Sequence, residues 1–94
     1  MTTYHLDITT PEGSCFDGDA VKLIIPGIDG QIGILAGHIP LVTALKGGEC
    51  RITLPDESVR KAHAGGGILT VGRDADGQTT VHLLSTDFAF VVGS

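Results

Sequence analysis

The chain has 94 residues, of which 41% are hydrophobic and 18% charged, a composition that fits one compact globular domain spanning 1–94. A domain of this size buries only about 60–65% of the surface that its unfolded chain exposes, which leaves little apolar surface for a deep catalytic cleft. The formal net charge of −5 and the lack of any run of Lys or Arg argue against nucleic acid as a partner.

The amino terminus shows neither a basic leader nor a continuous apolar segment. No apolar run approaches the roughly 18 residues that a membrane-spanning helix needs. We therefore expect neither export nor membrane spanning and interpret the chain as cytosolic. Cys15 and Cys50 stand outside any C-x-x-C pair, which favours reduced thiols over a zinc or redox site.

Short segments rich in Val, Ile, Leu and Thr are separated by many of the 14 glycines, a pattern typical of an all-β domain with many short strands and no helix. The first segment, 4–9, alternates apolar and polar residues. It predicts a strand with Tyr4, Leu6 and Ile8 on the core side and a wet opposite side.

A turn at 11–13 and a more buried strand at 20–25, ending at Pro26, are expected next. Residues 26–40 contain four glycines and two prolines, so a helix there would be heavily penalised. We expect an exposed loop, a short strand through Ile32 and Ile34, and a second tight turn.

The second half of the chain offers one strand after another, with Asp76-Gly77 as a strong hairpin signal between two of them. In the last segment, Phe88, Phe90 and Val92 should share one side. Eight or more short strands in so short a chain imply a sandwich or barrel, because their apolar faces must cover one another. The strands expected in this half are 41–45, 49–54, 59–64, 67–71, 79–84 and 88–92.

The glycine-rich segments do not predict a cofactor site. Gly27-x-x-Gly30-x-x-Gly33 lacks the spacing of either phosphate-binding loop, so no nucleotide is expected there. The run 65–67 is better explained as a bend where two backbones approach closely. The segment 74–77 resembles the start of a calcium loop but has no carboxylate near the required twelfth position, which favours a solvated hairpin turn.

No catalytic or metal-ligating set stands out. Two of the four histidines occupy polar positions of alternating strands, and none forms an H-x-H pair, so exposed strand-face residues are favoured over a metal site. A Gly-x-Ser-x-Gly nucleophile motif is absent. The histidines are His5, His38, His63 and His82.

Five blocks of sequence, in order along the chain, carry a specific resemblance. Together they resemble the epsilon subunit of F-type ATP synthases over about residues 4–86. The blocks are YHLDI (4–8), TPEG (10–13), PGIDGQIGIL (26–35), GHIPLVTALK (37–46) and GGILTV (66–71).

The resemblance implies an all-β fold, a two-sheet β-sandwich of about ten short strands. It also implies a non-catalytic central-stalk subunit that links the gamma subunit to the polar loops of the c-ring in proton-motive-force-driven ATP synthesis. Such a subunit would be membrane-associated only through the complex, on the cytoplasmic side of the inner membrane, and is expected to be bacterial.

By similarity, the c-ring contact is a glycine-rich loop, and the gamma contact is a stretch around the second turn together with the end of the first strand. The same residues could instead serve the fold, as glycines with positive φ or as core side chains. The implied c-ring contact is Gly27, Ile28, Asp29, Gly30 and Gln31, and the implied gamma contact is Thr10, His38, Leu41, Val42, Thr43 and Lys46.

Two departures from the family limit what is carried over. Ala36 stands where family members often have Pro. Long members continue into a C-terminal helical hairpin that brakes ATP hydrolysis and in some members binds ATP, whereas this sequence has 88–92 in place of the acidic link and stops at Ser94. Neither inhibition nor ATP binding is assigned, and a naturally short subunit and a truncated one fit equally.

Two other classes of protein compete with this interpretation. One is a free-standing β-sandwich or barrel that binds a small ligand, and the other is a metal-dependent enzyme that uses the scattered histidines. Both predict a concave site, whereas a stalk subunit predicts flat, partly apolar patches.

Overall fold

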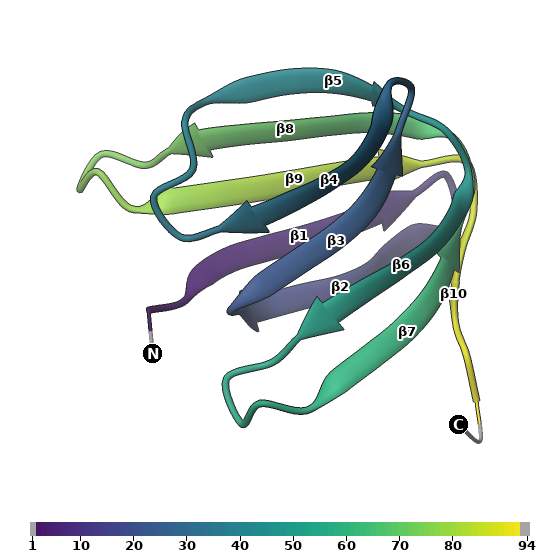
Figure 1. Cartoon of the computed structure of the whole chain (residues 1–94), viewed down its shortest axis with the longest axis horizontal. Coiled ribbons are helices and arrows are strands. Elements are labelled where there is room, and N and C mark those ends of the chain that lie inside the picture. Colours follow the sequence, from purple (N-terminus) through teal and green to yellow (C-terminus); the bar gives the residue numbers. More distant parts are fainter. Residues whose placement is uncertain (1, 93–94) are drawn as a thin grey trace.

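The computed structural model describes residues 2–92, and the secondary structure there consists of strands and turns (Figure 1). The strands are β1 (Tyr4–Thr10), β2 (Gly13–Ala20), β3 (Lys22–Gly27), β4 (Gly30–Leu35), β5 (Leu41–Leu45), β6 (Gly48–Thr53), β7 (Val59–Ala64), β8 (Gly67–Arg73), β9 (Thr79–Ser85) and β10 (Phe88–Phe90).

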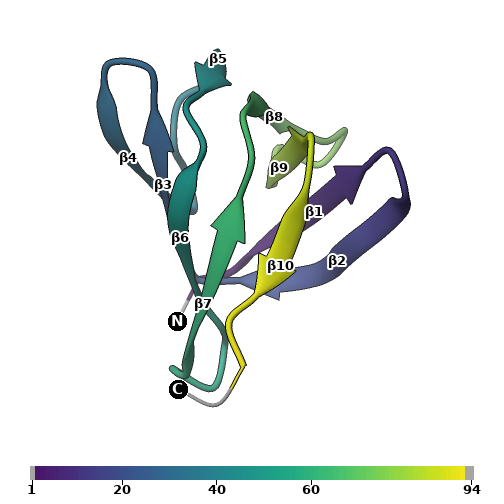
Figure 2. The ribbon, with the colours of Figure 1, turned by 90° about the vertical axis from the view of Figure 1, so that its right-hand side faces the viewer.

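The strands form two layers. Their hydrogen-bonded order is β10-β7-β6-β3-β5-β8-β9-β1-β2, and β4 pairs with β3 outside that path. Strand β3 reaches β5 through a single residue pair, Gly27 with Leu45, so the path bends there into two five-stranded layers (Figure 2). One layer contains β4, β3, β6, β7 and β10, and the other contains β5, β8, β9, β1 and β2. The predicted two-sheet β-sandwich of about ten strands is confirmed.

The core lies between the layers and is built from alternate residues of each strand. In β1, Tyr4, Leu6 and Ile8 are buried, as the alternation predicted. The Tyr4 hydroxyl donates to the Ile34 carbonyl on β4 at 2.9 Å, which joins the two layers through a buried hydrogen bond. Burial raises the pKa of Tyr4 far above its usual value. The remaining core side chains include Leu23, Ile25, Ile52, Leu69, Val71, Val81 and Leu83.

Strand β2 was not predicted, because its sequence GSCFDGDA has no apolar alternation. It exists through pairing with β1, from Tyr4 opposite Ala20 to Thr10 opposite Gly13. Since β2 ends the sheet order, most of its residues are partly or fully exposed and polar side chains are tolerated.

The predicted strand 20–25 was wrong at both ends, because β3 runs from Lys22 to Gly27 and includes Pro26. The Pro26 carbonyl accepts a hydrogen bond from the Lys46 amide at 3.1 Å. On that side of β3 the neighbour changes from β6, which pairs up to Ile24, to β5, which pairs at Gly27. The missing N–H of Pro26 therefore falls where no ladder bond is required.

An aromatic cluster closes the gap between β10 and β2, the two ends of the sheet order. The Phe90 ring packs edge-on against Phe88, with centroids 5.2 Å apart, and against Phe16 of β2 at 6.4 Å. The Arg60 guanidinium lies 4.0 Å from the centroid of the Phe90 ring. Val92, predicted to share this side, lies beyond β10 and is 93% exposed, so that part of the prediction was wrong.

The glycine run and the acidic turn behave as the sequence predicted. A Cβ on Gly67 would overlap the Leu84 carbonyl of the paired strand β9, so only glycine fits. Between β8 and β9, the Asp74 carboxylate accepts hydrogen bonds from the amides of Asp76 and Gln78, both at 2.9 Å. This is a hairpin turn, with Gly77 at φ 79°.

Candidate interaction surfaces

The predicted c-ring loop is the tip of the β3–β4 hairpin. Gly27 pairs with Gly30, which leaves Ile28 and Asp29 as a two-residue turn. Gly30 has a φ of 131°, where a side chain would be strained, whereas a Cβ on Gly27 would lie 2.6 Å from the Ile32 Cδ1 and would require that side chain to shift. Ile28 is 62% exposed, although it is a large apolar side chain at a turn. Figure 1 shows the hairpin at one extremity of the sandwich.

Backbone hydrogen bonds attach this tip to strand β5. The Ile28 amide donates to the Ala44 carbonyl at 3.4 Å, and the Lys46 amide donates to the Pro26 carbonyl at 3.1 Å. The loop is therefore held against the end of β5 rather than projecting alone. The predicted c-ring loop and part of the predicted gamma contact meet at this corner.

The outward side of β5, β8 and β9 carries an apolar strip. Val42, Ile68 and Leu84 are 71%, 48% and 55% exposed. Ala44 lies opposite Ile68, and Ile68 lies opposite Leu84, so these side chains form a row across three strands. We define Val42, Ala44, Ile68 and Leu84 as the apolar outer face.

A shallow groove of about 390 Å³ continues this face toward the β1–β2 hairpin. It is lined by Thr10 and Pro11 of the β1–β2 hairpin and by Gly66, Gly67, Ile68 and Leu84. Such an exposed, contiguous apolar surface is typical of a protein contact.

Two histidine–carboxylate contacts border the apolar outer face along β1. His82 Nδ1 lies 3.5 Å from Asp7 Oδ2, and His5 Nε2 lies 2.7 Å from Asp17 Oδ1. His82 and Asp7 are directly opposite each other on β9 and β1. The apolar strip is thus flanked by exposed polar side chains, as in the core and rim of a protein interface.

The structure distributes the predicted gamma-contact residues over several environments. Val42 points outward, whereas Leu41 and Thr43 alternate to the inner side of β5 and are partly buried. Lys46 is exposed beside the hairpin tip. His38 lies in the turn before β5, and its ring nitrogen Nδ1 is 2.7 Å from the Ile39 carbonyl.

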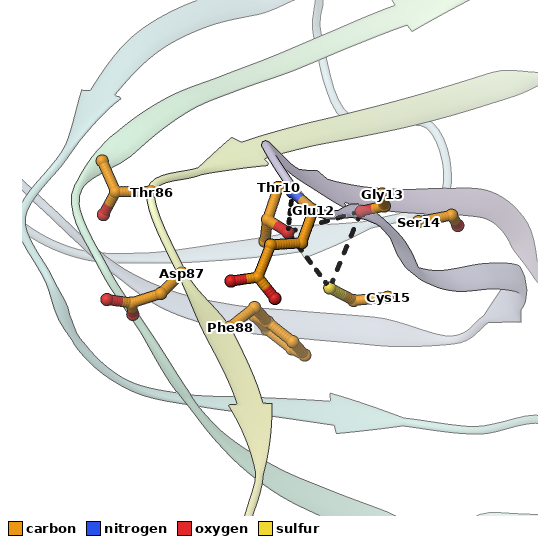
Figure 3. A pocket seen from close by; sticks show the side chains of 8 residues that line it. All are labelled: Thr10, Glu12, Gly13, Ser14, Cys15, Thr86, Asp87 and Phe88. Atoms are coloured by element: carbon orange, nitrogen blue, oxygen red, sulfur yellow. Dashed lines mark hydrogen bonds between the residues drawn. The ribbon is translucent and has the colours of Figure 1, made fainter.

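Thr10 lies between the groove and a second hollow of about 370 Å³ (Figure 3). Its hydroxyl accepts from the Glu12 amide at 3.2 Å and lies 3.8 Å from the Cys15 sulfur. These contacts stabilise the β1–β2 turn. The hollow is walled by this turn and by residues 86–88, and its side chains do not form a nucleophile and base pair.

Sequence reasoning missed Ile68 and Leu84. The available signal was two adjacent apolar residues, Ile68-Leu69 and Leu83-Leu84, in strands where one face had to be wet. Since Leu69 and Leu83 fill the core, Ile68 and Leu84 must face outward.

Within residues 2–92, the structure contains no group of three or more His, Cys, Asp or Glu side chains placed to hold a metal ion. The described part of the chain also has no helix long and apolar enough to cross a membrane.

The ten-strand sandwich, with an exposed apolar face and an anchored hairpin tip, places the chain in the class of small β-sandwich domains. Residues 3–81 match the family described as "ATP synthase, Delta/Epsilon chain, beta-sandwich domain". The chain belongs to this family.

Curated relatives agree with the family match. The ATP synthase epsilon chain of Bordetella avium is 38% identical over 71 residues, which are 76% of this chain and 50% of the relative. The epsilon chain of Delftia acidovorans is 41% identical over 71 residues, 76% of this chain and 51% of the relative. The chain thus spans about half the length of the curated relatives it matches.

Two solved structures share the fold. One, from Euglena gracilis, is described as mitochondrial ATP synthase, OSCP/F1/c-ring, with a TM-score of 0.82, 18% identity and coverage of 96% of this chain and 54% of that chain. The other, from Tetrahymena thermophila, is described as mitochondrial ATP synthase central stalk/c-ring, with a TM-score of 0.72, 14% identity and coverage of 94% and 66%.

Proposed function

We propose that this domain is a non-catalytic rotor component of an F-type ATP synthase that links the gamma subunit to the c-ring. The observation that carries the proposal is the apolar outer face, on which Val42, Ile68 and Leu84 are exposed on three neighbouring strands. In a small domain such a strip is an unsatisfied surface unless a partner covers it. The family membership and the synthase structures that share the fold support gamma as that partner.

The second contact of a linker is the hairpin tip Gly27–Gln31. Ile28 offers an exposed apolar side chain and Asp29 an exposed carboxylate, a pair suited to a polar loop with a basic residue. Because the tip is bonded to the end of β5, which belongs to the apolar outer face, the two contacts are mechanically connected. This connection suits a part that transmits torque between two bodies. Association with the membrane is then peripheral, through the complex, on the cytoplasmic side.

Ligand binding by a free-standing domain is the competing function. The groove beside Ile68 is an open extension of the apolar outer face, and the hollow of Figure 3 is bordered mainly by polar turn residues. Neither resembles the enclosed apolar pocket of a small-molecule site. Calorimetry with ATP should therefore show no saturable micromolar binding, which would correspond to about 8 kcal/mol.

Copurification with gamma tests the proposal directly. The full chain, coexpressed with the gamma subunit of its own synthase, should copurify with it, and Ile68→Glu with Leu84→Glu should abolish this by burying two carboxylates in the contact. The matched control is Leu35→Glu with Val59→Glu, two exposed apolar residues of the other layer, which should leave the complex intact.

A further variant distinguishes the apolar outer face from the gamma contact that the sequence predicted. His38→Glu with Thr43→Glu changes residues that do not belong to the apolar outer face. We expect a smaller loss of gamma binding than for Ile68 and Leu84. If wild-type chain and gamma fail to copurify, or if the Ile68 and Leu84 variant binds normally while folded, the proposal is abandoned.

A further inference from the structure

The outer face of the layer that contains β3, β6 and β7 carries positive charge, opposite to the net charge of the whole chain. Lys22 on β3, Arg51 on β6 and Lys61 on β7 are exposed on three neighbouring strands. The chain contains six Lys and Arg against 11 Asp and Glu, so half of its Lys and Arg residues are on this face. Within the strands of this layer, as far as residues 2–92 are described, the one carboxylate is Glu49. We define Lys22, Arg51 and Lys61 as the basic face.

The arrangement of these cations works against the stability of the fold. Arg51 and Lys61 are directly opposite each other on β6 and β7, and like charges in that position are destabilising. Glu49 compensates only Arg51, at 3.1 Å from both Nε and Nη2. Lys22 and Lys61 form no ion pair among the described residues 2–92.

A thermodynamically unfavourable pair on an otherwise regular sheet points to a binding role. On the opposite layer Asp7 and Asp17 are also directly opposite each other, on β1 and β2, but each carboxylate has a histidine beside it, His82 and His5 respectively. On the basic face, Lys61 has no oppositely charged neighbour of this kind among the described residues 2–92.

We propose that the basic face binds a carboxylate-rich polypeptide segment that lies across β3, β6 and β7. Adjacent strands are about 4.8 Å apart, close to the 5–6 Å spacing of side chains three or four residues apart on a helix. Ile24 lies directly beside Arg51 and is half-buried, so it offers apolar contact between the cations. A partner with acidic side chains at helical spacing therefore fits the face in charge and in geometry.

The direction of the face favours a polypeptide over a lipid surface, an argument that rests on the proposed function. The hairpin tip is at the end of β3, whereas the basic face lies along the side of the same strand. If the tip contacts the ring, the basic face is turned sideways to the membrane. The face also belongs to the layer opposite the apolar outer face, so gamma and the acidic segment could be bound together.

The test measures binding of a labelled glutamate-rich helical peptide to the full chain by fluorescence anisotropy. Lys61→Glu should weaken binding at least about fivefold, and binding should weaken further as salt is raised from about 20 to about 200 mM. Arg73→Glu, an exposed residue at the end of β8, changes the net charge equally and should leave the affinity within about twofold of wild type.

Stability supplies a second, independent measurement. Lys61→Glu places a carboxylate opposite Arg51, so it should raise Tm by about 2–4 °C while lowering the affinity for the peptide. A structural role for Lys61 would lower Tm instead, and that result would overturn the proposal.

Three other outcomes also overturn it: undetectable peptide binding to wild type, equal weakening by Arg73→Glu, or tighter Lys61-dependent binding to phosphatidylserine vesicles than to the peptide. The last outcome would assign the face to a lipid surface. Since gamma is absent from these measurements, their failure leaves the rotor proposal standing, and failed copurification leaves the peptide result standing.

Discussion

Tyr4 holds the two layers together from inside the core. Its hydroxyl donates to the Ile34 carbonyl, and the phenol is surrounded by apolar side chains. Burial raises its pKa because the phenolate would lose its hydration. As the chain has one Tyr and no Trp, this single group reports the packing of the whole interior.

Tyr4→Phe should therefore reduce stability and change its dependence on pH. At neutral pH the loss of one buried hydrogen bond should cost about 1 kcal/mol. Since the folded pKa of Tyr4 is raised, its stabilising effect is complete below about pH 10 and is lost as pH rises above that value, where the unfolded state releases the proton. Urea unfolding at neutral and alkaline pH should show a steeper alkaline loss for wild type than for the variant. Tyrosinate absorbance near pH 10 in the folded protein would contradict this.

The two cysteines differ in environment and should differ in reactivity. Cys50 is fully buried, and burial together with the neighbouring Glu49 carboxylate raises the pKa of its thiol to about 11. Cys15 is partly exposed beside the hollow of Figure 3. Iodoacetamide at mildly alkaline pH should modify one thiol in the native protein and both in urea. Cys15→Ser should remove the native reaction, and rapid native modification of Cys50 would show that β6 opens locally.

At the scale of strands, the sequence predicted those elements whose own side chains alternate between core and solvent. Strand β1 was predicted from the alternation of apolar and polar residues over 4–9. Strand β2 could not be, because it is formed by pairing with β1 and has polar residues suited to an edge. The strand was wrongly predicted to end at Pro26 for a related reason, since a proline is tolerated within β3 only because the neighbouring strand changes there from β6 to β5.

The candidate site divides in the same way. The glycines and prolines of 26–40 predicted an exposed loop before a short strand through Ile32 and Ile34, which is a local property of the chain. The bond from Ile28 to Ala44 and the row formed by Ile68 and Leu84 depend on contacts between strands distant in sequence. Alternation could show that Ile68 faces outward, but only the pairing of β8 with β5 and β9 places it in a continuous face.

The close approach of β8 and β9 at Gly67 gives a test of strand packing. Gly67→Ala would force a methyl group into the Leu84 carbonyl, so we expect the free energy of unfolding to fall by at least about 2 kcal/mol. Gly33→Ala is the control, because a Cβ there meets no atom within 4 Å and the glycine has an ordinary φ. The free energy of unfolding of the Gly33→Ala variant should be within about 0.5 kcal/mol of the wild-type value. Equal stabilities in urea unfolding would show that the strands can separate there at little cost.

The hairpin tip can be tested apart from the fold. Ile28→Ser with Asp29→Lys should change the free energy of unfolding by no more than about ±0.5 kcal/mol, as expected for an exposed turn, and should leave Tm nearly unchanged. It should weaken attachment of the gamma-bound domain to the c-ring and lower coupled ATP synthesis in reconstituted vesicles. Ala75→Ser with Asp76→Lys makes similar changes at the β8–β9 turn and should do neither. Normal coupling with the Ile28 variant present in the complex would make the tip an ordinary turn.

At the scale of the whole molecule, the sandwich presents different chemistry on its two outer faces. The β5-β8-β9 side is apolar with histidine–carboxylate contacts at its border, and the β3-β6-β7 side is basic. Because the layers are joined at one corner through Gly27 and Leu45, and at the opposite gap by Phe16 and Phe90, both faces belong to one packed body. A load applied at one face can therefore reach the other without an intervening hinge.

Such a body should unfold as one unit, and the prediction of a single domain rests on this. In urea, circular dichroism of the strands and Tyr4 fluorescence should give coincident transitions. The free energy of unfolding should fall by about 1 kcal/mol for each molar increase in urea. Phe90→Ala removes the edge-on contacts with Phe88 and Phe16, so both transitions should shift together by about 2–3 kcal/mol. Val92→Ala, at a residue 93% exposed, should change neither. If Phe90→Ala shifts the circular dichroism transition but not the Tyr4 transition, the two layers unfold separately and the aromatic cluster does not close the sandwich.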